Sequence, residues 1–171
     1  MIGRFLRKVP RISKTSFIAA SAQLIGAVRV GEYASVWFNV VARADINRIE
    51  IGAYTNIQDS AILHVEDNRG LCIGKYATVG HGAILHACYI EDCALIGMGA
   101  IILNGARIGK GSIVAAGSVV TRDFKAPGYR LIMGFPAKVV RKLTEQEKKE
   151  NIYWAKKYVK LSREYRGRKQ I

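Results

Sequence analysis

Aliphatic residues recur at about every sixth position over most of this chain. Helices repeat apolar residues at about 3.6 positions and strands at 2, so neither element explains the period. A parallel β-helix does, because each hexapeptide forms one flat wall and three hexapeptides complete a triangular coil. The aliphatic positions are Ile18, Leu24, Val30, Val36, Ile51, Ile57, Leu63, Ile73, Val79, Leu85, Ile90, Ile96, Ile102, Ile108, Val114 and Val120. The period therefore predicts an all-β, hexapeptide-repeat solenoid.

Small residues accompany the aliphatic ones at fixed offsets. The next position is often glycine, as at Gly31, Gly80 and Gly97, and position five is usually small, as at Ala77 and Ala83. Glycine adopts the backbone angles of a tight corner without steric cost, and a small side chain fits inside the prism beside the aliphatic one. A generic β-sandwich would not keep a spacing of six across so many positions, so we prefer the prism.

The rhythm also predicts where the solenoid begins and ends. We expect one domain over residues 1–171, with the β-helix over 15–123, a connecting segment over 124–143 and a C-terminal α-helix over 144–166. Residues 48–50 and the stretch 65–72 interrupt the period and are expected to form loops at prism corners.

A capping box marks the start of the expected helix. Thr144 is followed three residues later by Glu147, the spacing at which the two side chains cap each other's backbone N–H groups. The helix would present one apolar face, formed by Trp154, Tyr158, Leu161 and Tyr165. That face should pack back along the prism.

Composition is typical of a single soluble domain. The chain has 171 residues, half of them hydrophobic, and no apolar stretch approaches the ~20 residues needed to cross a bilayer. The first ten residues contain no apolar run long enough for a secretory signal, so we expect a cytoplasmic protein without stable membrane insertion. Cys72, Cys88 and Cys93 are an odd number without paired spacing and are interpreted as small buried thiols, not disulfides or ligands.

The formal charge of +14 is concentrated at the two ends of the chain. Residues 1–14 contain five basic and no acidic side chains, and residues 141–171 contain eleven basic and four acidic ones. Basic tails on a nearly neutral body could steer anions or touch an acidic membrane or partner. No nucleic-acid motif and no groove of interleaved aromatic and basic residues is present, so we expect no nucleic-acid partner.

The three histidines of the chain lie in one short window, at His64, His81 and His86. Three imidazoles with one open coordination position form the usual zinc site for activating water. Grouping by chance of core or solvent-facing histidines is the alternative. Asn56 and Gln58 precede the three histidines and add polar side chains to the same region.

Counting hexapeptides places these histidines on the prism. His64 and His86 follow Leu63 and Leu85, which lie one complete coil apart, so they should stack on the same wall and point outward. His81 belongs to the neighbouring wall, and one prism cannot easily bring all three together. Three prisms around a threefold axis could place His81 of one subunit against the pair of the next. The geometry therefore predicts a homotrimer with shared metal sites.

Several motifs in order and spacing resemble the γ-class carbonic anhydrase family over nearly the whole chain. They are the run 35–45 (SVWFNVVARAD), then Asn56-Ile57-Gln58-Asp59, Leu63-His64-Val65, the run 79–83 (VGHGA), Leu85-His86-Ala87 and the run 96–100 (IGMGA). The resemblance implies a left-handed β-helix and a homotrimer. It also implies a metal held by His64 and His86 of one subunit with His81 of another: zinc, with ferrous iron or cobalt(II) as alternatives.

The same resemblance implies roles for the other polar residues. Gln58 matches a residue that orients the metal-bound ligand. Arg43, Asp45 and Asp59 match residues that make polar and ionic contacts at the subunit interface beside the metal, although an ion pair of Arg43 with an aspartate could be purely structural. Asn56 would position substrate or hold a corner. Tyr158 resembles a tyrosine that reaches the active site in relatives, and core packing is the alternative.

The implied reaction is the reversible hydration of carbon dioxide to bicarbonate. A metal with three imidazole ligands lowers the pKa of bound water from 15.7 to about 7, so hydroxide is available near neutrality. The archetypal family member exports protons through a glutamate in an acidic loop after the first histidine. The corresponding segment here is short and offers only Glu66 and Asp67, so proton export is expected to be slow.

Two other classes of function remain open. Hexapeptide-repeat acyltransferases share the prism, the trimer and an ending like the segment 134–138 (GFPAK), but they need one general base, not three ligands. A metal-stabilised trimer could also act as a scaffold, or as a hydrolase on another small carbonyl substrate such as a thioester. Metal content distinguishes the acyltransferase from the anhydrase.

Overall fold

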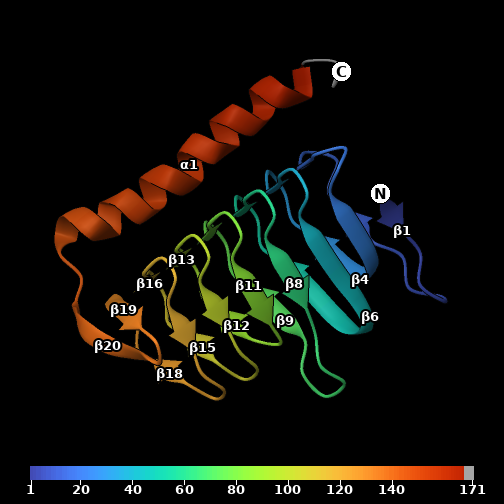
Figure 1. The fold of residues 1–171 in the computed structure, drawn as a ribbon. Coiled ribbons are helices and arrows are strands. Elements are labelled where there is room, and N and C mark those ends of the chain that lie inside the picture. The colour runs from blue at the N-terminus through green and yellow to red at the C-terminus, as the bar shows by residue number, and fades with distance from the viewer. Residues whose placement is uncertain (168–171) are drawn as a thin grey trace.

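The computed structural model describes residues 1–167 of the chain. Parallel strands stack coil upon coil into a solenoid, and one long helix, α1 (Glu145–Gly167), lies along its side (Figure 1). The predicted all-β solenoid with a C-terminal helix is thereby confirmed.

The strands form three walls. The first wall contains β3 (Phe17–Ile18), β5 (Ser35–Val36), β7 (Asn56–Ile57), β10 (Thr78–Val79), β13 (Leu95–Ile96), β16 (Ile113–Val114), β19 (Arg130–Gly134) and the antiparallel β20 (Ala137–Lys142). The second wall contains β1 (Ile2–Gly3), β8 (Ile62–His64), β11 (Ile84–His86), β14 (Ile101–Ile102) and β17 (Val119–Val120). The third wall contains β2 (Arg11–Ile12), β9 (Leu71–Ile73), β12 (Tyr89–Ile90), β15 (Arg107–Ile108) and β18 (Lys125–Ala126).

Two long strands connect the second and third walls. The first half of β6 (Val41–Ile51) pairs with β8, and its last residues pair with β9. The strand β4 (Gln23–Val30) runs beside it, and the pairing of the two shifts register between Gly26 and Val28. The residues 48–50, expected in a corner loop, therefore lie inside β6 at the start of the third wall.

The core is a column of stacked aliphatic side chains. Leu63 is opposite Leu85, and Leu85 is opposite Ile102, each one coil further along the prism. All three are fully buried, as are most of the residues at the six-residue positions. Burial of each such side chain contributes about 1.5–3 kcal/mol relative to exposure. The inward direction of the hexapeptide period is therefore confirmed.

The glycines that follow the aliphatic residues serve a different purpose from the expected one. A Cβ on Gly97 would lie 2.4 Å from the backbone nitrogen of Ala116, and one on Gly80 would lie 2.7 Å from that of Met98. Neither glycine has a positive φ, whereas Gly82, two positions after Gly80, has a φ of 66°. Close approach of the next coil, not a corner backbone angle, excludes a side chain at Gly80 and Gly97.

The strands extend beyond the expected range 15–123 at both ends. The strands β1 and β2 precede it, and β18 to β20 occupy most of the segment 124–143 that was expected to be a connection. The six-residue spacing in fact continues to Ala126 and Ile132, both buried in the same core. This last coil was not predicted because Ala126, and not a larger aliphatic residue, occupies the position six residues after Val120.

The helix α1 begins at the predicted capping box and packs on the first wall. The backbone N–H of Thr144 donates to Glu147 Oε2 at 2.8 Å, and the backbone N–H of Glu147 donates to Thr144 Oγ1 at 3.2 Å. The helix runs back over β3, β5, β7 and β10 (Figure 1). Tyr158 and Tyr165 both pack edge-on against Trp37.

Three further expectations concern thiols, the apolar helix face and the membrane. All three cysteines are free, but only Cys88 is fully buried, while Cys72 and Cys93 are half-buried. Trp154, expected on the packed face of the helix, is 39% exposed. Within residues 1–167 no helix is long and apolar enough to cross a membrane.

We predict that Ile108→Ala destabilises the protein by about 2–5 kcal/mol, because Ile108 is fully buried in the stacked column. The neighbouring Arg107 provides the control, since its contacts with Glu91 and the Tyr89 ring are exposed and Arg107→Ala should cost only about 1 kcal/mol or less. Urea denaturation followed by circular dichroism measures both. Equal effects of the two substitutions would contradict an inward-facing Ile108.

Candidate metal centre

His64 and His86 lie side by side on the outer surface of the second wall. The parallel pairing of β8 with β11 sets His64 directly opposite His86, as hexapeptide counting predicted. His64 Nδ1 and His86 Nε2 face each other at 3.0 Å. Two imidazole nitrogens bound to one tetrahedral zinc ion at 2.0–2.1 Å lie roughly 3.3 Å apart. The spacing of this pair therefore suits two ligands of one ion.

The outer nitrogens of both rings are held by oxygen acceptors. His64 Nε2 lies 3.2 Å from Asp45 Oδ1, and His86 Nδ1 lies 2.8 Å from Asn104 Oδ1. An imidazole nitrogen that donates to an oxygen carries the proton, so the other nitrogen of a neutral ring presents a lone pair. The inner nitrogens, His64 Nδ1 and His86 Nε2, face each other at 3.0 Å, close enough to share one proton or to bind one cation. Oxygen acceptors on the outer ring nitrogens are the arrangement that orients histidines in metal sites.

Electrostatics keep His64 in the form that binds metals. Burial and the positive charge of Arg43 lower the pKa of His64 below its ordinary value of 6.5, against the opposing effect of Asp45. Burial tends to raise the pKa of Asp45, but hydrogen bonds from the Arg43 guanidinium and from backbone N–H groups outweigh it and lower that pKa. At neutral pH His64 is therefore neutral and Asp45 is ionised, which is the pairing that a metal site needs.

Asn104 is the residue of this group that the sequence did not reveal. It lies in the turn after β14, one coil beyond the turn that follows His86. An asparagine in a turn is common for local backbone reasons, so its type gave no signal. Only the stacking of coils places its carboxamide oxygen against His86.

His81 belongs to a second group of polar residues on the first wall. His81 Nδ1 lies 2.7 Å from Asp59 Oδ2, and Asp59 Oδ1 also accepts the backbone N–H of Phe38 at 3.3 Å. The negative Asp59 and burial both raise the pKa of Tyr158 above its ordinary value, with burial the larger cause. Tyr158 therefore stays a phenol at neutral pH, close to Asp59.

Gln58 and Asn56 form a buried chain of hydrogen bonds beside this group. Gln58 Nε2 donates to Asn56 Oδ1 at 3.1 Å, and Asn56 Nδ2 donates to Thr78 Oγ1 at 2.9 Å. The three side chains are almost fully buried. This chain leaves the Gln58 carboxamide oxygen without a partner from these residues.

A cavity of about 380 Å³ opens between the first wall and α1. Its polar lining comes from Gln58, His81 and Tyr158, and its apolar lining includes Met98 and Trp154. The predicted residues Gln58, His81, Asp59 and Tyr158 thus gather at one place between the first wall and α1. Arg43, Asp45, His64 and His86 gather at another.

One protomer does not bring the two groups together. Among residues 1–167 no set of three or more His, Cys, Asp or Glu side chains is placed to hold a metal ion. The pair of the second wall offers two ligands, and His81 is engaged with Asp59. The expectation that a third ligand comes from another subunit stays a prediction.

Known proteins resemble the chain over most of its length. Gamma carbonic anhydrase 2 of Arabidopsis thaliana, a mitochondrial protein, is 40% identical over 161 residues, which cover 91% of this chain and 58% of that protein. The carbonic anhydrase of Geobacillus kaustophilus is 43% identical over 170 residues, covering 99% of this chain and 93% of that protein. The chain belongs to the γ-class carbonic anhydrase family. It spans little more than half the length of the plant relative.

Other proteins similar to this carbonic anhydrase homologue are not named carbonic anhydrases. The carnitine operon protein CaiE of Escherichia coli is 39% identical over 162 residues, covering 94% of this chain and 80% of that protein. The family model for the bacterial transferase hexapeptide (six repeats) matches residues 87–122. A solved structure of a hexapeptide transferase family protein from Anaplasma phagocytophilum has a TM-score of 0.93 and 40% identity, covering 96% of this chain and 97% of that one.

We predict that Asn104→Ala weakens metal binding by about 10–100-fold while leaving His64 and His86 in place, because Asn104 fixes the orientation of the His86 ring. Competition with a chromogenic chelator measures the affinity. Asn68→Ala, in an exposed loop, is the control and should bind metal like the wild type. An Asn104→Ala protein of unchanged affinity would show that the carboxamide is not part of the site.

We also predict that the metal-free protein loses stability as pH falls below about 6.5. The folded-state pKa of His64 is lowered, so below that pH the unfolded chain binds a proton at His64 more readily than the folded chain does. Urea midpoints across the range from about pH 7.5 to 5 measure the loss. The His64→Gln protein should show a shallower dependence, and an identical slope would contradict the lowered pKa.

Proposed function

We propose that the protein catalyses the reversible hydration of carbon dioxide to bicarbonate at a metal centre shared between two subunits. His64 and His86 of one subunit and His81 of its neighbour would hold the ion, and zinc is the metal that best suits three imidazoles. The observation that carries the proposal is the pair of imidazole nitrogens, His64 Nδ1 and His86 Nε2, that face each other at 3.0 Å. Membership of the γ-class carbonic anhydrase family supports it.

The placement of the two groups supports a homotrimer. The histidine pair lies on the second wall, whereas His81 lies in the turn that follows β10 of the first wall. The pair and His81 therefore face different directions on one prism. A threefold axis makes one complementary contact between these two surfaces into three equal sites. The ion pair of Arg43 with Asp45 would lie at that contact, next to His64.

The chain's own residues would bind and orient the reactants. When bound, the metal ion provides the Lewis acidity that brings the pKa of a water molecule to about 7. The Gln58 carboxamide, fixed by Asn56, would orient bicarbonate or water through its remaining hydrogen-bonding atoms. Tyr158, kept as a phenol, would donate a hydrogen bond from the same cavity. Asp59 would fix the tautomer of His81.

Proton export is the step for which the chain is least equipped. Glu66 and Asp67 are the acidic residues that the loop after His64 offers for proton export. Glu66 lies 3.4 Å from the Arg122 guanidinium. This contact ties the Glu66 side chain to the turn that follows β17. Hydration would therefore be limited by transfer of protons to external buffer.

A hydrolase or acyl-transfer reaction is the second candidate function. The cavity beside Gln58 and His81 is large for carbon dioxide and has an apolar lining that includes Leu95, Ile113 and Trp154. A larger acyl group would fill such an apolar lining better than carbon dioxide does. The similar solved structure from Anaplasma phagocytophilum is named a hexapeptide transferase family protein, which agrees with an acyl-transfer function. A metal requirement separates a metal-dependent hydrolase from an acyltransferase that uses one histidine base.

The shared site predicts a specific pattern of complementation. His81→Ala alone should lose its metal although the pair remains, because the third ligand is missing from every interface. Co-expression with His64→Ala should restore about a quarter of the wild-type metal content under statistical mixing, since each mixed trimer contains one complete interface. Metal analysis of the purified mixture measures this.

Co-expression of His64→Ala with His86→Ala is the matched control, because both ligands must come from the same subunit and no interface can be complete. Equal metal content in the two mixtures, or no recovery in the first, would rule out shared ligands.

Gln58→Ala is predicted to leave the metal content unchanged and to reduce carbon dioxide hydration, because Gln58 would contact the reactant and not the ion. Stopped-flow hydration at measured metal content tests this. Thr78→Val, which removes only the far end of the hydrogen-bonded chain, should have a smaller effect. Full activity of Gln58→Ala would remove this residue from the mechanism.

A further inference from the structure

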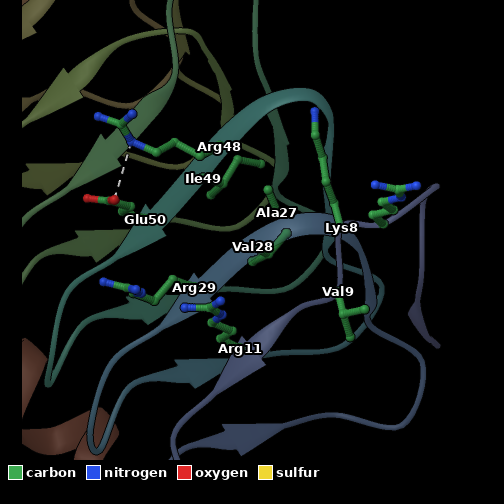
Figure 2. Close-up of a pocket in the computed structure, with 10 residues that line it drawn as sticks. Lys8, Val9, Arg11, Ala27, Val28, Arg29, Arg48, Ile49 and Glu50 are labelled. Atoms are coloured by element: carbon green, nitrogen blue, oxygen red, sulfur yellow. Dashed lines mark ion pairs between the residues drawn. The ribbon is translucent and has the colours of Figure 1, made fainter.

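A basic pocket lies at the N-terminal end of the third wall. It has a volume of about 320 Å³ and is lined by residues from the N-terminal segment, β4 and β6. Its charged lining consists of five cationic side chains and one carboxylate, namely Arg7, Lys8, Arg11, Arg29, Arg48 and Glu50 (Figure 2).

Two of these cations are stacked by the parallel register of the wall. Arg11 of β2 is directly opposite Arg29 of β4, and Figure 2 shows the two side chains next to one another on neighbouring strands. Like charges directly opposite each other destabilise a sheet. The next residue in the same register, Glu50 of β6, could offset that repulsion.

Glu50 is already engaged, however. Arg48 Nε lies 3.3 Å from Glu50 Oε1. Lys8 is engaged as well, since its ammonium donates to the carbonyl oxygens of Asp45 and Ile46 at 2.7 and 3.2 Å.

The remaining three cations lack a counter-charge. Over the described range 1–167, the side chains of Arg7, Arg11 and Arg29 have no hydrogen bond or ion pair, and all three residues are exposed. Three guanidinium groups around one pocket, two of them forced together by the fold, form a strongly positive concave surface.

The arginine pair lies on a different wall from the metal centre, and Lys8 connects the pocket to it only through the backbone carbonyl of Asp45. The histidine pair lies on the second wall and α1 covers the first, whereas Arg11, Arg29 and Glu50 all belong to the third. Subunit contacts made through the second wall would leave the third wall open. The basic pocket is therefore not explained by the proposed hydration reaction.

We propose that this pocket binds a multivalent phosphate, such as the di- or triphosphate group of a small molecule. A planar guanidinium donates two parallel N–H groups to a phosphate, so adjacent Arg11 and Arg29 could each bind one phosphoryl group. A multiply charged anion also removes the repulsion between the two cations, which a singly charged bicarbonate does less well.

Isothermal titration of the full-length, metal-loaded protein with sodium tripolyphosphate tests the proposal. The wild type should bind one equivalent per subunit, with affinity that falls as salt rises. Arg11→Gln/Arg29→Gln should bind about tenfold more weakly or worse, and Arg29→Lys, which keeps the charge but loses the planar fork, should fall between.

A second double variant controls for net charge and for extraction of metal by the phosphate. Arg107→Gln/Lys125→Gln removes two cations that also stack in register on the third wall, at its far end. There Arg107 lies 4.0 Å from Glu91 and over the Tyr89 ring. This variant should bind tripolyphosphate within about twofold of the wild type. Equal weakening in both double variants would reduce the effect to overall charge and overturn the proposal.

Folding failure does not obscure the result, because removing the repulsion between Arg11 and Arg29 should leave the unliganded protein at least as stable as the wild type. A flotation assay with phosphatidylglycerol vesicles provides the second arm. Binding to vesicles without saturable binding of tripolyphosphate would overturn the proposal in favour of a membrane surface. Unaltered hydration activity of Arg11→Gln/Arg29→Gln would show that this site is independent of the metal centre.

Discussion

The fold depends on the parallel stacking of one buried aliphatic side chain per hexapeptide. Because Leu63, Leu85 and Ile102 must lie above one another in the core, every outward residue beside them is stacked as well. The coil repeat brings residues about twenty positions apart in sequence into direct contact. His64 meets His86 and Arg11 meets Arg29 by this single constraint. Hydrophobic packing inside the prism thus fixes the electrostatics on its surface.

Such stacking places like groups against each other, as at the His64/His86 pair and the Arg11/Arg29 pair. The two pairs differ in the residues that surround them. At the histidine pair, Asp45 and Asn104 hold the outer nitrogens, so one nitrogen of each ring is turned toward the other and the two are placed to bind the proposed metal ion. At the arginine pair, the neighbouring carboxylate of Glu50 is engaged by Arg48, so two positive groups are left for an anion. In both places the solenoid brings two like groups together. We propose that a metal cation binds the two imidazoles and that a phosphate binds the two guanidinium groups.

The sequence predicted the features that follow from periodicity. It did not predict the features that depend on contacts between successive coils. The inward residues, the pairing of His64 with His86 and the capping box at Thr144 all follow from counting positions. Asn104 was missed because nothing in a turn asparagine indicates which side chain lies one coil below it. The last coil was missed because Ala126 occupies an aliphatic position, and Gly97 was assigned to backbone angle where the backbone of Ala116 is the true restraint.

The proposed activity requires that the facing imidazoles of His64 and His86 hold a catalytic metal. The most direct measurement is stopped-flow carbon dioxide hydration by protein of measured metal content, compared with the His81→Ala variant prepared in the same way. Hydration that scales with bound metal and is lost in the variant is the predicted result. A fully metallated protein that hydrates carbon dioxide no faster than the variant would contradict the account and assign the site to another carbonyl substrate.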